Sequence, residues 1–149
     1  MLFQVEEWGD IKHEMVPLVA KHWEECNHDP KEYFNIDEAQ YDTLAQVKMF
    51  LIVTLRHEGV LIGYVANSLM SNINAKHVLC AFELGWYLQP QYRKGGLGVK
   101  LLLETEIALK NKGVQKMYAA IPPGSRASII LDRLQWTEVE HHYSKWIGE

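Results

Sequence analysis

The residues with the clearest chemical potential form a short run rich in glycine and positive charge, Arg93-Lys94-Gly95-Gly96-Leu97-Gly98. The run follows a strand-like segment and precedes a helix-like one, so its amides would stand at a helix N-terminus. Backbone N–H groups there lack intrahelical partners, and the helix dipole adds partial positive charge. Glycine lets a phosphate approach these donors because no Cβ stands in the way. With Arg93 and Lys94 beside it, the loop predicts a diphosphate-binding site.

Two familiar phosphate loops do not fit this run. A Walker A loop requires a glycine, four residues and then Gly-Lys-Ser/Thr, and the sequence lacks that pattern. A dinucleotide fingerprint requires G-x-G-x-x-G at the first helix of a parallel unit. Here the glycines stand at 95, 96 and 98, and a predicted antiparallel hairpin precedes them.

Histidine and cysteine residues offer weaker alternatives. Cys26 and His28, with His22 before them, suggest a metal site, but no second ligand pair stands at zinc spacing. We therefore expect loop residues here and no metal. His141 and His142 could shuttle protons or could be surface residues of an edge strand, and the sequence leaves both readings open.

Two helices are expected before the first strands. Apolar residues recur three or four apart over Ile11–Trp23, which indicates an amphipathic helix. Pro17 lies inside this stretch, so we expect the regular helix to begin there, since proline is tolerated in a first turn. A second helix is predicted from Asp37 to Gln46, with Asn35 or Asp37 as its N-cap.

A mixed α/β sheet with helices on its faces is the expected architecture. A turn at His57-Glu58-Gly59 joins the first two strands into an antiparallel hairpin. A helix with Val99 on its apolar face follows the glycine-rich run and ends before Gly113, and a short helix covers Ser125–Leu134. Strands are predicted over Met49–Leu55, Val60–Val65, His77–Leu88 and Met117–Ile121, and around Thr137–Val139 and His142–Ile147.

Length and charge limit the possible functions. The 149 residues suit a single domain spanning residues 1–149. The net charge of −4 disfavours a broad electrostatic grip on nucleic acid. The acidic N-terminus does not resemble a signal peptide, and the longest apolar run, Met49–Leu55, is too short to span a bilayer. We expect a cytoplasmic protein that binds neither nucleic acid nor membrane.

The glycine-rich run resembles the signature of the GNAT superfamily of N-acetyltransferases, Gln/Arg-x-x-Gly-x-Gly/Ala. Arg93, Gly96 and Gly98 fill its three fixed positions. Leu88-Gln89-Pro90-Gln91-Tyr92-Arg93 matches the spacing with which the preceding strand commonly ends in that family. The resemblance extends over most of the chain, through the order of helices, hairpin, signature strand, loop and helix. It implies a mostly antiparallel sheet with splayed central strands.

This resemblance also implies a cofactor and a mechanism. The backbone of Tyr87 and Leu88 would pair with the pantetheine arm of acetyl-CoA, where the fourth strand bulges and splays from the fifth. The pyrophosphate would lie on the amides of Lys94-Gly95-Gly96-Leu97-Gly98-Val99. The Leu88 N–H would stabilise negative charge on the thioester oxygen while an amine attacks.

The chain departs from the family pattern where protons are transferred. Leu131 stands at the position of a tyrosine that protonates the departing thiolate in many members, and Gly124 replaces an asparagine that often touches the cofactor. Tyr143 is a candidate stand-in for the missing tyrosine. Glu83, on the signature strand, is the candidate general base, and its alternative role is that of an exposed glutamate paired with a cation.

These observations support two classes of function. The first is an N-acetyltransferase that transfers an acetyl group, or another acyl group, from coenzyme A to a primary amine of a small molecule or protein. The second is a coenzyme A-binding module that has lost turnover and acts through a protein partner, as Leu131 suggests. Members of the superfamily often form dimers, so a homodimer is one of the open oligomeric states.

Overall fold

The computed structural model describes residues 1–26 and 29–148. The chain divides into two compact units, Met1–Ala119 and Ala120–Glu149. Among the described residues, the first unit holds a five-stranded sheet and three α-helices, and the second holds one helix, α4 (Arg126–Arg133). The single domain expected over residues 1–149 stays a prediction.

The sheet has the order β1-β2-β3-β4-β5 and is antiparallel except for the last pair. A turn at Glu58 and Gly59 joins β2 to β3, and the positive φ angles of 50° and 82° at these two residues suit a tight hairpin. The mostly antiparallel, splayed sheet expected from the sequence is therefore confirmed. Its strands are β1 (Leu2–Glu6), β2 (Phe50–His57), β3 (Val60–Asn72), β4 (Ala75–Leu88) and β5 (Lys116–Tyr118).

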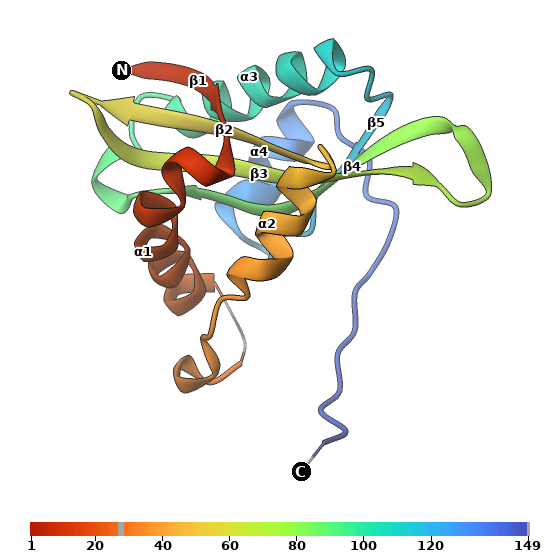
Figure 1. Cartoon of the computed structure of the whole chain (residues 1–149), viewed down its shortest axis with the longest axis horizontal. Helices are drawn as coiled ribbons and strands as arrows, with labels where there is room; N and C mark the ends of the chain where they lie inside the picture. Colours follow the sequence, from red (N-terminus) through yellow and green to blue (C-terminus); the bar gives the residue numbers. More distant parts are fainter. Residues whose placement is uncertain (27–28, 149) are drawn as a thin grey trace. The chain divides into compact units, whose positions relative to one another are not determined.

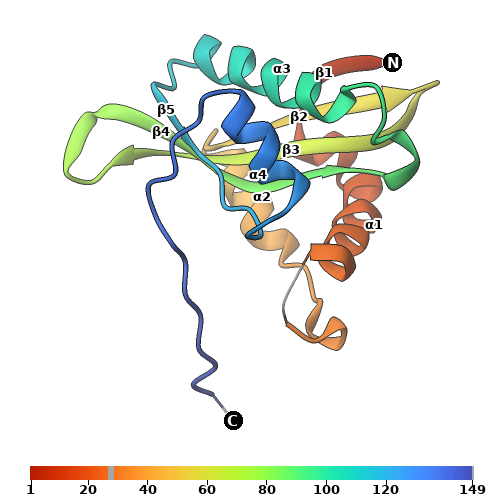
Figure 2. The same ribbon diagram turned by 180° about the vertical axis from the view of Figure 1, so that it is seen from behind.

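Helices of the first unit cover both faces of the sheet (Figure 1, Figure 2). On one face lie α1 (Trp8–Cys26) and α2 (Glu38–Gln46), which begins at the predicted N-cap Asp37. On the other face lies α3 (Leu97–Asn111), which ends before Gly113 as expected. Short 3-10 turns span Lys31–Tyr33 and Pro90–Tyr92.

Two sequence predictions about these elements are wrong, and one strand was missed. Helix α1 does not begin at Pro17 but runs through it, because Trp8, Ile11 and Met15 are buried against the sheet. Each buried apolar side chain contributes roughly 1.5–3 kcal/mol, which together exceeds the cost of about 3 kcal/mol for an interior proline. Strand β1 was not predicted, because its burial does not alternate. Residues 136–148 contain no strand, since this segment pairs with none of the described strands.

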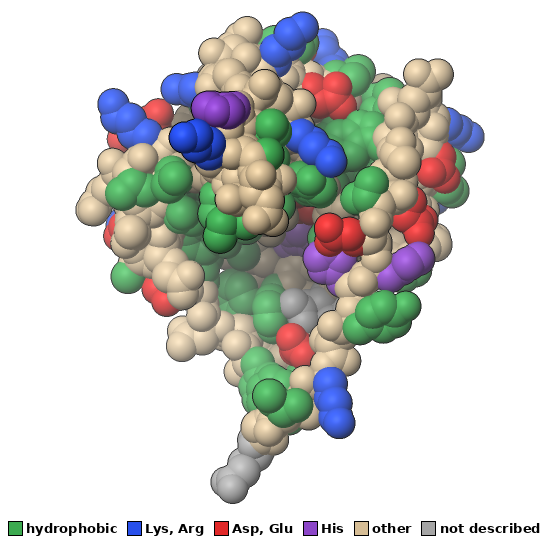
Figure 3. Space-filling view, turned by 90° about the vertical axis from the view of Figure 1, so that its right-hand side faces the viewer, with side chains coloured by type: hydrophobic (Ala, Val, Ile, Leu, Met, Phe, Trp, Pro, Cys, Tyr) green, Lys and Arg blue, Asp and Glu red, His purple; other side chains and the backbone are tan. Residues whose placement is uncertain are grey.

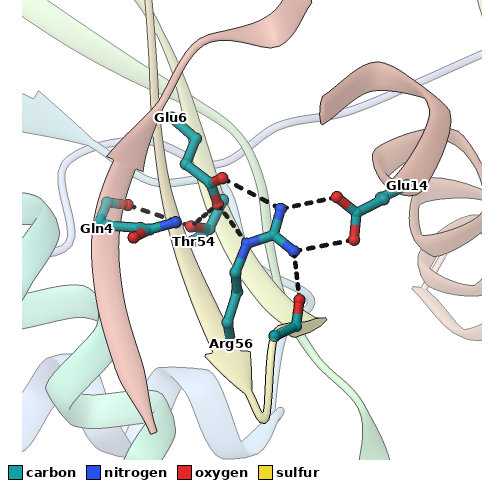
Figure 4. A network of polar contacts seen from close by, with 6 residues as sticks. Gln4, Glu6, Glu14, Thr54 and Arg56 are labelled. Carbon is teal, nitrogen blue, oxygen red and sulfur yellow. Dashed lines mark hydrogen bonds and ion pairs between the residues drawn. The ribbon is translucent and has the colours of Figure 1, made fainter. Parts of the chain in front are cut away.

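An ion-pair network joins β1, β2 and α1 (Figure 4). The Arg56 guanidinium, 12% exposed, lies 2.9 Å from Glu6 Oε2 and 2.8 Å from Glu14 Oε1. Its Nη1 also donates to the Gly59 carbonyl at 2.7 Å. Burial alone would raise the pKa of Glu6, but hydrogen bonds from Arg56 and Thr54 outweigh it and lower the pKa. The network fixes β1 and α1 on the sheet.

The surface carries both signs of charge. Acidic and basic side chains are interspersed on the face viewed in Figure 3. Among the described helices, none combines the length and apolar character that a bilayer-crossing helix needs.

Candidate active site

The C-terminal part of β4, residues 83–88, has an open edge. Strand β5 pairs with β4 only from Cys80 to Phe82, while β4 continues to Leu88. A bulge interrupts β4 directly beyond the paired segment, because Ala66 faces Gly85 and Asn67 faces Glu83, leaving Leu84 unmatched. A bulge bends the strand and re-aims its backbone. Among the described strands, only β3 pairs with residues 83–88, so the splay expected from the sequence is present.

Backbone groups at the end of β4 point into this open edge. The Gln89 N–H donates to the Ile62 carbonyl of β3 at 2.9 Å. Because successive residues of a strand direct their backbone groups to opposite sides, the Leu88 N–H and carbonyl face away from β3. The Arg93 Nε donates to the Leu88 carbonyl at 2.6 Å, which agrees with a carbonyl that faces away from β3. The neighbouring Leu88 N–H is therefore directed toward the splay.

The glycine-rich loop forms the N-terminus of α3. Gly95 and Gly96 have φ angles of +70° and +77°, and Gly96 caps the helix without a side-chain hydrogen bond. The Lys100 N–H makes the first intrahelical bond, to the Gly96 carbonyl at 3.0 Å. The N–H groups of Leu97, Gly98 and Val99 thus precede the first intrahelical bond of α3.

Free space surrounds this helix terminus. A Cβ added at Gly95, Gly96 or Gly98 would meet no atom within 4 Å. Uncapped amides, an open approach and the nearby exposed Lys94 together fit a diphosphate group. The residues present therefore suit the pyrophosphate of coenzyme A, which the family resemblance implies.

Arg93 is held by the protein itself. Its guanidinium forms a two-pronged ion pair with the Glu25 carboxylate of α1, with Nη2 at 2.7 Å from Oε2. It also lies over the Tyr87 ring, 5.4 Å from the centroid. Hydrogen bonding from Arg93 lowers the pKa of Glu25, so both groups are charged at neutral pH. Arg93 thus ties the loop to α1 and β4, whereas direct contact with phosphate stays a prediction.

An aromatic cluster beside this ion pair was missed by the sequence analysis. His22 Nδ1 lies 2.9 Å from the Tyr64 hydroxyl, and the His22 ring stacks on Tyr87 at 5.1 Å between centroids. Burial lowers the pKa of His22 and raises that of Tyr64. A usable signal was the three-residue spacing of His22 and Glu25, which places both on one side of a helix.

The two predicted catalytic residues belong to different units. Glu83 is half-buried on β4 at the bulge, and its charge adds to burial in raising the pKa of Cys26 and Tyr64. Tyr143 is 92% exposed and lies in the irregular segment of the second unit. Leu131 is the buried residue of α4. His28 lies outside the described residues.

Comparisons with known proteins identify the family. Solved structures share the fold across nearly the whole chain, and their low sequence identities support a shared fold only. A predicted acetyltransferase from Clostridium acetobutylicum, solved with acetyl-CoA, has a TM-score of 0.78 at 11% identity and covers 98% of this chain and 96% of its own. An aminoglycoside acetyltransferase from an uncultured soil metagenomic sample, solved with sisomicin, has a TM-score of 0.74 at 14% identity. The match covers 97% of this chain and 95% of the aminoglycoside acetyltransferase.

A third relative acts on protein according to its name. The ribosomal-protein-alanine N-acetyltransferase of Brucella melitensis biovar Abortus 2308 has a TM-score of 0.67 at 15% identity, and covers 100% of this chain and 99% of its own. No curated protein sequence matches the chain. The sequence model of the acetyltransferase (GNAT) family matches residues 12–131, which include most of α1, strands β2 to β5 and the glycine-rich loop. The chain therefore belongs to the GNAT acetyltransferase family.

Proposed function

We propose that this protein transfers an acetyl group from acetyl-CoA to a primary amine. One observation supports this proposal most strongly. The first unit contains both the open edge of β4, into which the Leu88 N–H is directed, and the uncapped N-terminus of α3. The relative from Clostridium acetobutylicum was solved with acetyl-CoA, which supports this choice of cofactor.

Two parts of the first unit would hold acetyl-CoA. The N–H groups of Leu97, Gly98 and Val99 would bind the pyrophosphate, with Lys94 adding positive charge. The Leu88 backbone would pair with the pantetheine arm along the open edge, whereas the backbone groups of Tyr87, one residue earlier, face β3. When bound, the cofactor supplies an acetyl group activated as a thioester.

Two tasks then fall to this chain's own residues. The Leu88 N–H would donate to the thioester oxygen as negative charge develops there, which is a large stabilising contribution in acyl transfer. A second group must remove a proton from the attacking amine. Glu83 stands at the bulge and is the candidate from the sequence. Tyr143 stays a candidate for the thiolate's proton donor.

The acceptor is an amine of a small molecule or a protein. Support for both comes from relatives of the same fold, one solved with sisomicin and one named for a ribosomal-protein alanine. The net charge of −4 suits a cationic acceptor. A cytoplasmic location and a homodimeric state are further predictions.

A second function is favoured by one residue. Leu131, at the position of the family's proton-donating tyrosine, has no proton to give, which fits a coenzyme A-binding module without turnover that acts through a protein partner. Acetyl-CoA binding would be common to both functions.

Release of coenzyme A decides between them. The protein is mixed with acetyl-CoA and, in turn, sisomicin, spermidine and an alanine-terminated peptide, and free thiol and N-acetyl product are both measured. Amine-dependent thiol release with matching product supports the transferase. Saturable acetyl-CoA binding without release above hydrolysis supports the binding module instead.

A further inference from the structure

A histidine–tyrosine pair covers the splayed part of β4. His22 comes from the C-terminal half of α1, Tyr64 from β3 and Tyr87 from β4. The His22 ring stacks on Tyr87, the residue before Leu88, and its Nδ1 lies 2.9 Å from the Tyr64 hydroxyl. The imidazole is thereby fixed over the segment of β4 that β5 leaves unpaired.

Gly85 makes room for this pair. A Cβ at Gly85 would lie 3.2 Å from the Tyr64 hydroxyl oxygen and 3.3 Å from His22 Nδ1. Contacts this close require the neighbouring atoms to move. The absence of a side chain immediately after the bulge thus lets the imidazole approach the backbone of β4.

The imidazole has one nitrogen engaged and one available. Nδ1 faces the Tyr64 hydroxyl, whereas Nε2 makes no hydrogen bond with any residue of 1–26 or 29–148. In the tautomer with the proton on Nδ1, that N–H donates to the Tyr64 oxygen and a lone pair remains on Nε2. Burial raises the pKa of the Tyr64 phenol, so this partner stays neutral.

Charged and titratable groups surround the ring. Burial lowers the pKa of His22 most strongly, Glu25 opposes this effect and Arg93 adds to it. Because Glu25 and Arg93 neutralise each other as an ion pair, burial dominates and the imidazole is neutral at pH 7. The titratable and charged groups around this cluster come from five parts of the first unit: Glu25 and Cys26 on α1, Tyr41 on α2, Tyr64 on β3, Glu83 and Tyr87 on β4, and Arg93 in the loop.

We propose that His22 is the catalytic residue that takes the proton from the acceptor amine. This inference rests on the proposed function. The amine nitrogen gives one proton to Nε2 and forms the C–N bond to the acetyl carbon as the C–S bond breaks. Coenzyme A leaves as a thiolate, which takes a proton from solvent, and the imidazolium returns its proton to solvent.

Imidazole suits this task better than the Glu83 carboxylate. A general base works best when its pKa lies near the working pH, and histidine, near 6.5 when unperturbed, lies closer to neutrality than glutamate, near 4.3. His22 is also held by contacts from two strands, through the Tyr64 hydroxyl of β3 and the Tyr87 ring of β4.

The test compares three variants. His22→Asn keeps a polar group near the Tyr64 hydroxyl and removes Nε2, Glu83→Gln tests the rival base, and His13→Asn makes the same change at an exposed position of α1. Rates are measured from pH 5 to 9 with the best amine substrate among sisomicin, spermidine and an alanine-terminated peptide. Acetyl-CoA affinity and the ¹⁵N shifts of the His22 ring are measured alongside.

His22→Asn is expected to lower kcat by about 100-fold or more, as loss of a general base does, with acetyl-CoA affinity unchanged. The acid limb of the pH–rate profile should disappear in this variant and persist in Glu83→Gln and His13→Asn. The wild-type ring should be neutral at pH 7 with its proton on Nδ1.

Two results overturn the inference alone. One is a His22→Asn enzyme that keeps the wild-type rate and profile, and the other is loss of the acid limb in Glu83→Gln rather than in His22→Asn. Absence of thiol release from the wild-type protein with every amine would instead contradict the proposed function, and this inference with it.

Discussion

Substitutions at three glycines in or next to α3 can distinguish the effect of backbone strain from the effect on ligand binding. Gly96 at the N-terminus and Gly113 beyond the C-terminus have φ angles of +77° and +83°, and Gly98 has no positive φ. A Cβ at any of the three meets no atom within 4 Å. Alanine at Gly96 and Gly113, and leucine at Gly98, therefore probe backbone conformation and ligand approach without a clash at Cβ.

The expected stability changes follow from these angles. Left-handed conformation costs an L-residue about 1–2 kcal/mol, so Gly96→Ala and Gly113→Ala should each lower Tm by roughly 2–8 °C. Leucine, like alanine, is favoured over glycine within a helix by roughly 0.5–1 kcal/mol, so Gly98→Leu should leave Tm unchanged or raise it slightly.

The affinity for acetyl-CoA should group these variants differently from their stability. A methyl group at Gly96, or a leucine side chain at Gly98, keeps a phosphate from at least one amide, and hydrogen bonds to charged groups contribute about 1.5–3 kcal/mol. Alanine itself is accepted at the Gly98 position of the family signature, so a larger side chain is needed there. The Kd for acetyl-CoA should rise by roughly 10- to 150-fold in Gly96→Ala and Gly98→Leu and stay unchanged in Gly113→Ala.

Calorimetric titration with acetyl-CoA and thermal unfolding of the ligand-free proteins provide the two readouts. The informative variant is Gly98→Leu, which should be as stable as the wild type yet bind acetyl-CoA poorly. Wild-type affinity in both Gly96→Ala and Gly98→Leu would refute the assignment of the α3 terminus as the phosphate site.

Three further predictions concern the framework of the site. Arg56→Met leaves two half-buried carboxylates without their cation, which costs about 3–5 kcal/mol and should lower Tm by roughly 6–20 °C in thermal unfolding; a shift below 2 °C would contradict this role. The pKa of Glu25 is lowered in the folded state, so its ion pair stabilises the fold above the usual glutamate pKa and is lost as pH falls through the lowered value. Denaturant unfolding of Glu25→Gln should thus depend less on pH below about 4.3 than that of the wild type, and parallel curves would argue against the pair. A Cβ at Gly63 would lie 2.9 Å from the Tyr87 carbonyl oxygen, so Gly63→Ala should shift the end of β4 and reduce both Tm and kcat, whereas an unchanged kcat would separate that strand end from catalysis.

Local patterns allowed the cofactor half of the site to be predicted. The glycine-rich loop, the helix after it and the end of β4 depend on residues within a short stretch of chain. Hydrophobic periodicity and the stop at Gly113 therefore located α3 correctly. The same reasoning failed at Pro17, because local proline chemistry yielded to burial of the helix against the sheet.

The proposed proton-transfer half of the site depends on contacts between residues that are distant in the sequence. His22 and Tyr64 are 42 positions apart, and Arg93 and Glu25 are 68 apart. No periodicity relates such residues, so His22 was considered only with its neighbours Cys26 and His28 as a metal ligand. Strands around Thr137–Val139 and His142–Ile147 were wrongly predicted for a related reason, since a strand requires a pairing partner that the local pattern does not reveal.

A crystal structure of the protein with acetyl-CoA tests the central claim most directly. The account predicts the pyrophosphate within hydrogen-bonding distance of the Leu97, Gly98 and Val99 amides, and the thioester oxygen beside the Leu88 N–H. A cofactor bound elsewhere, or none at saturating concentration, would contradict it.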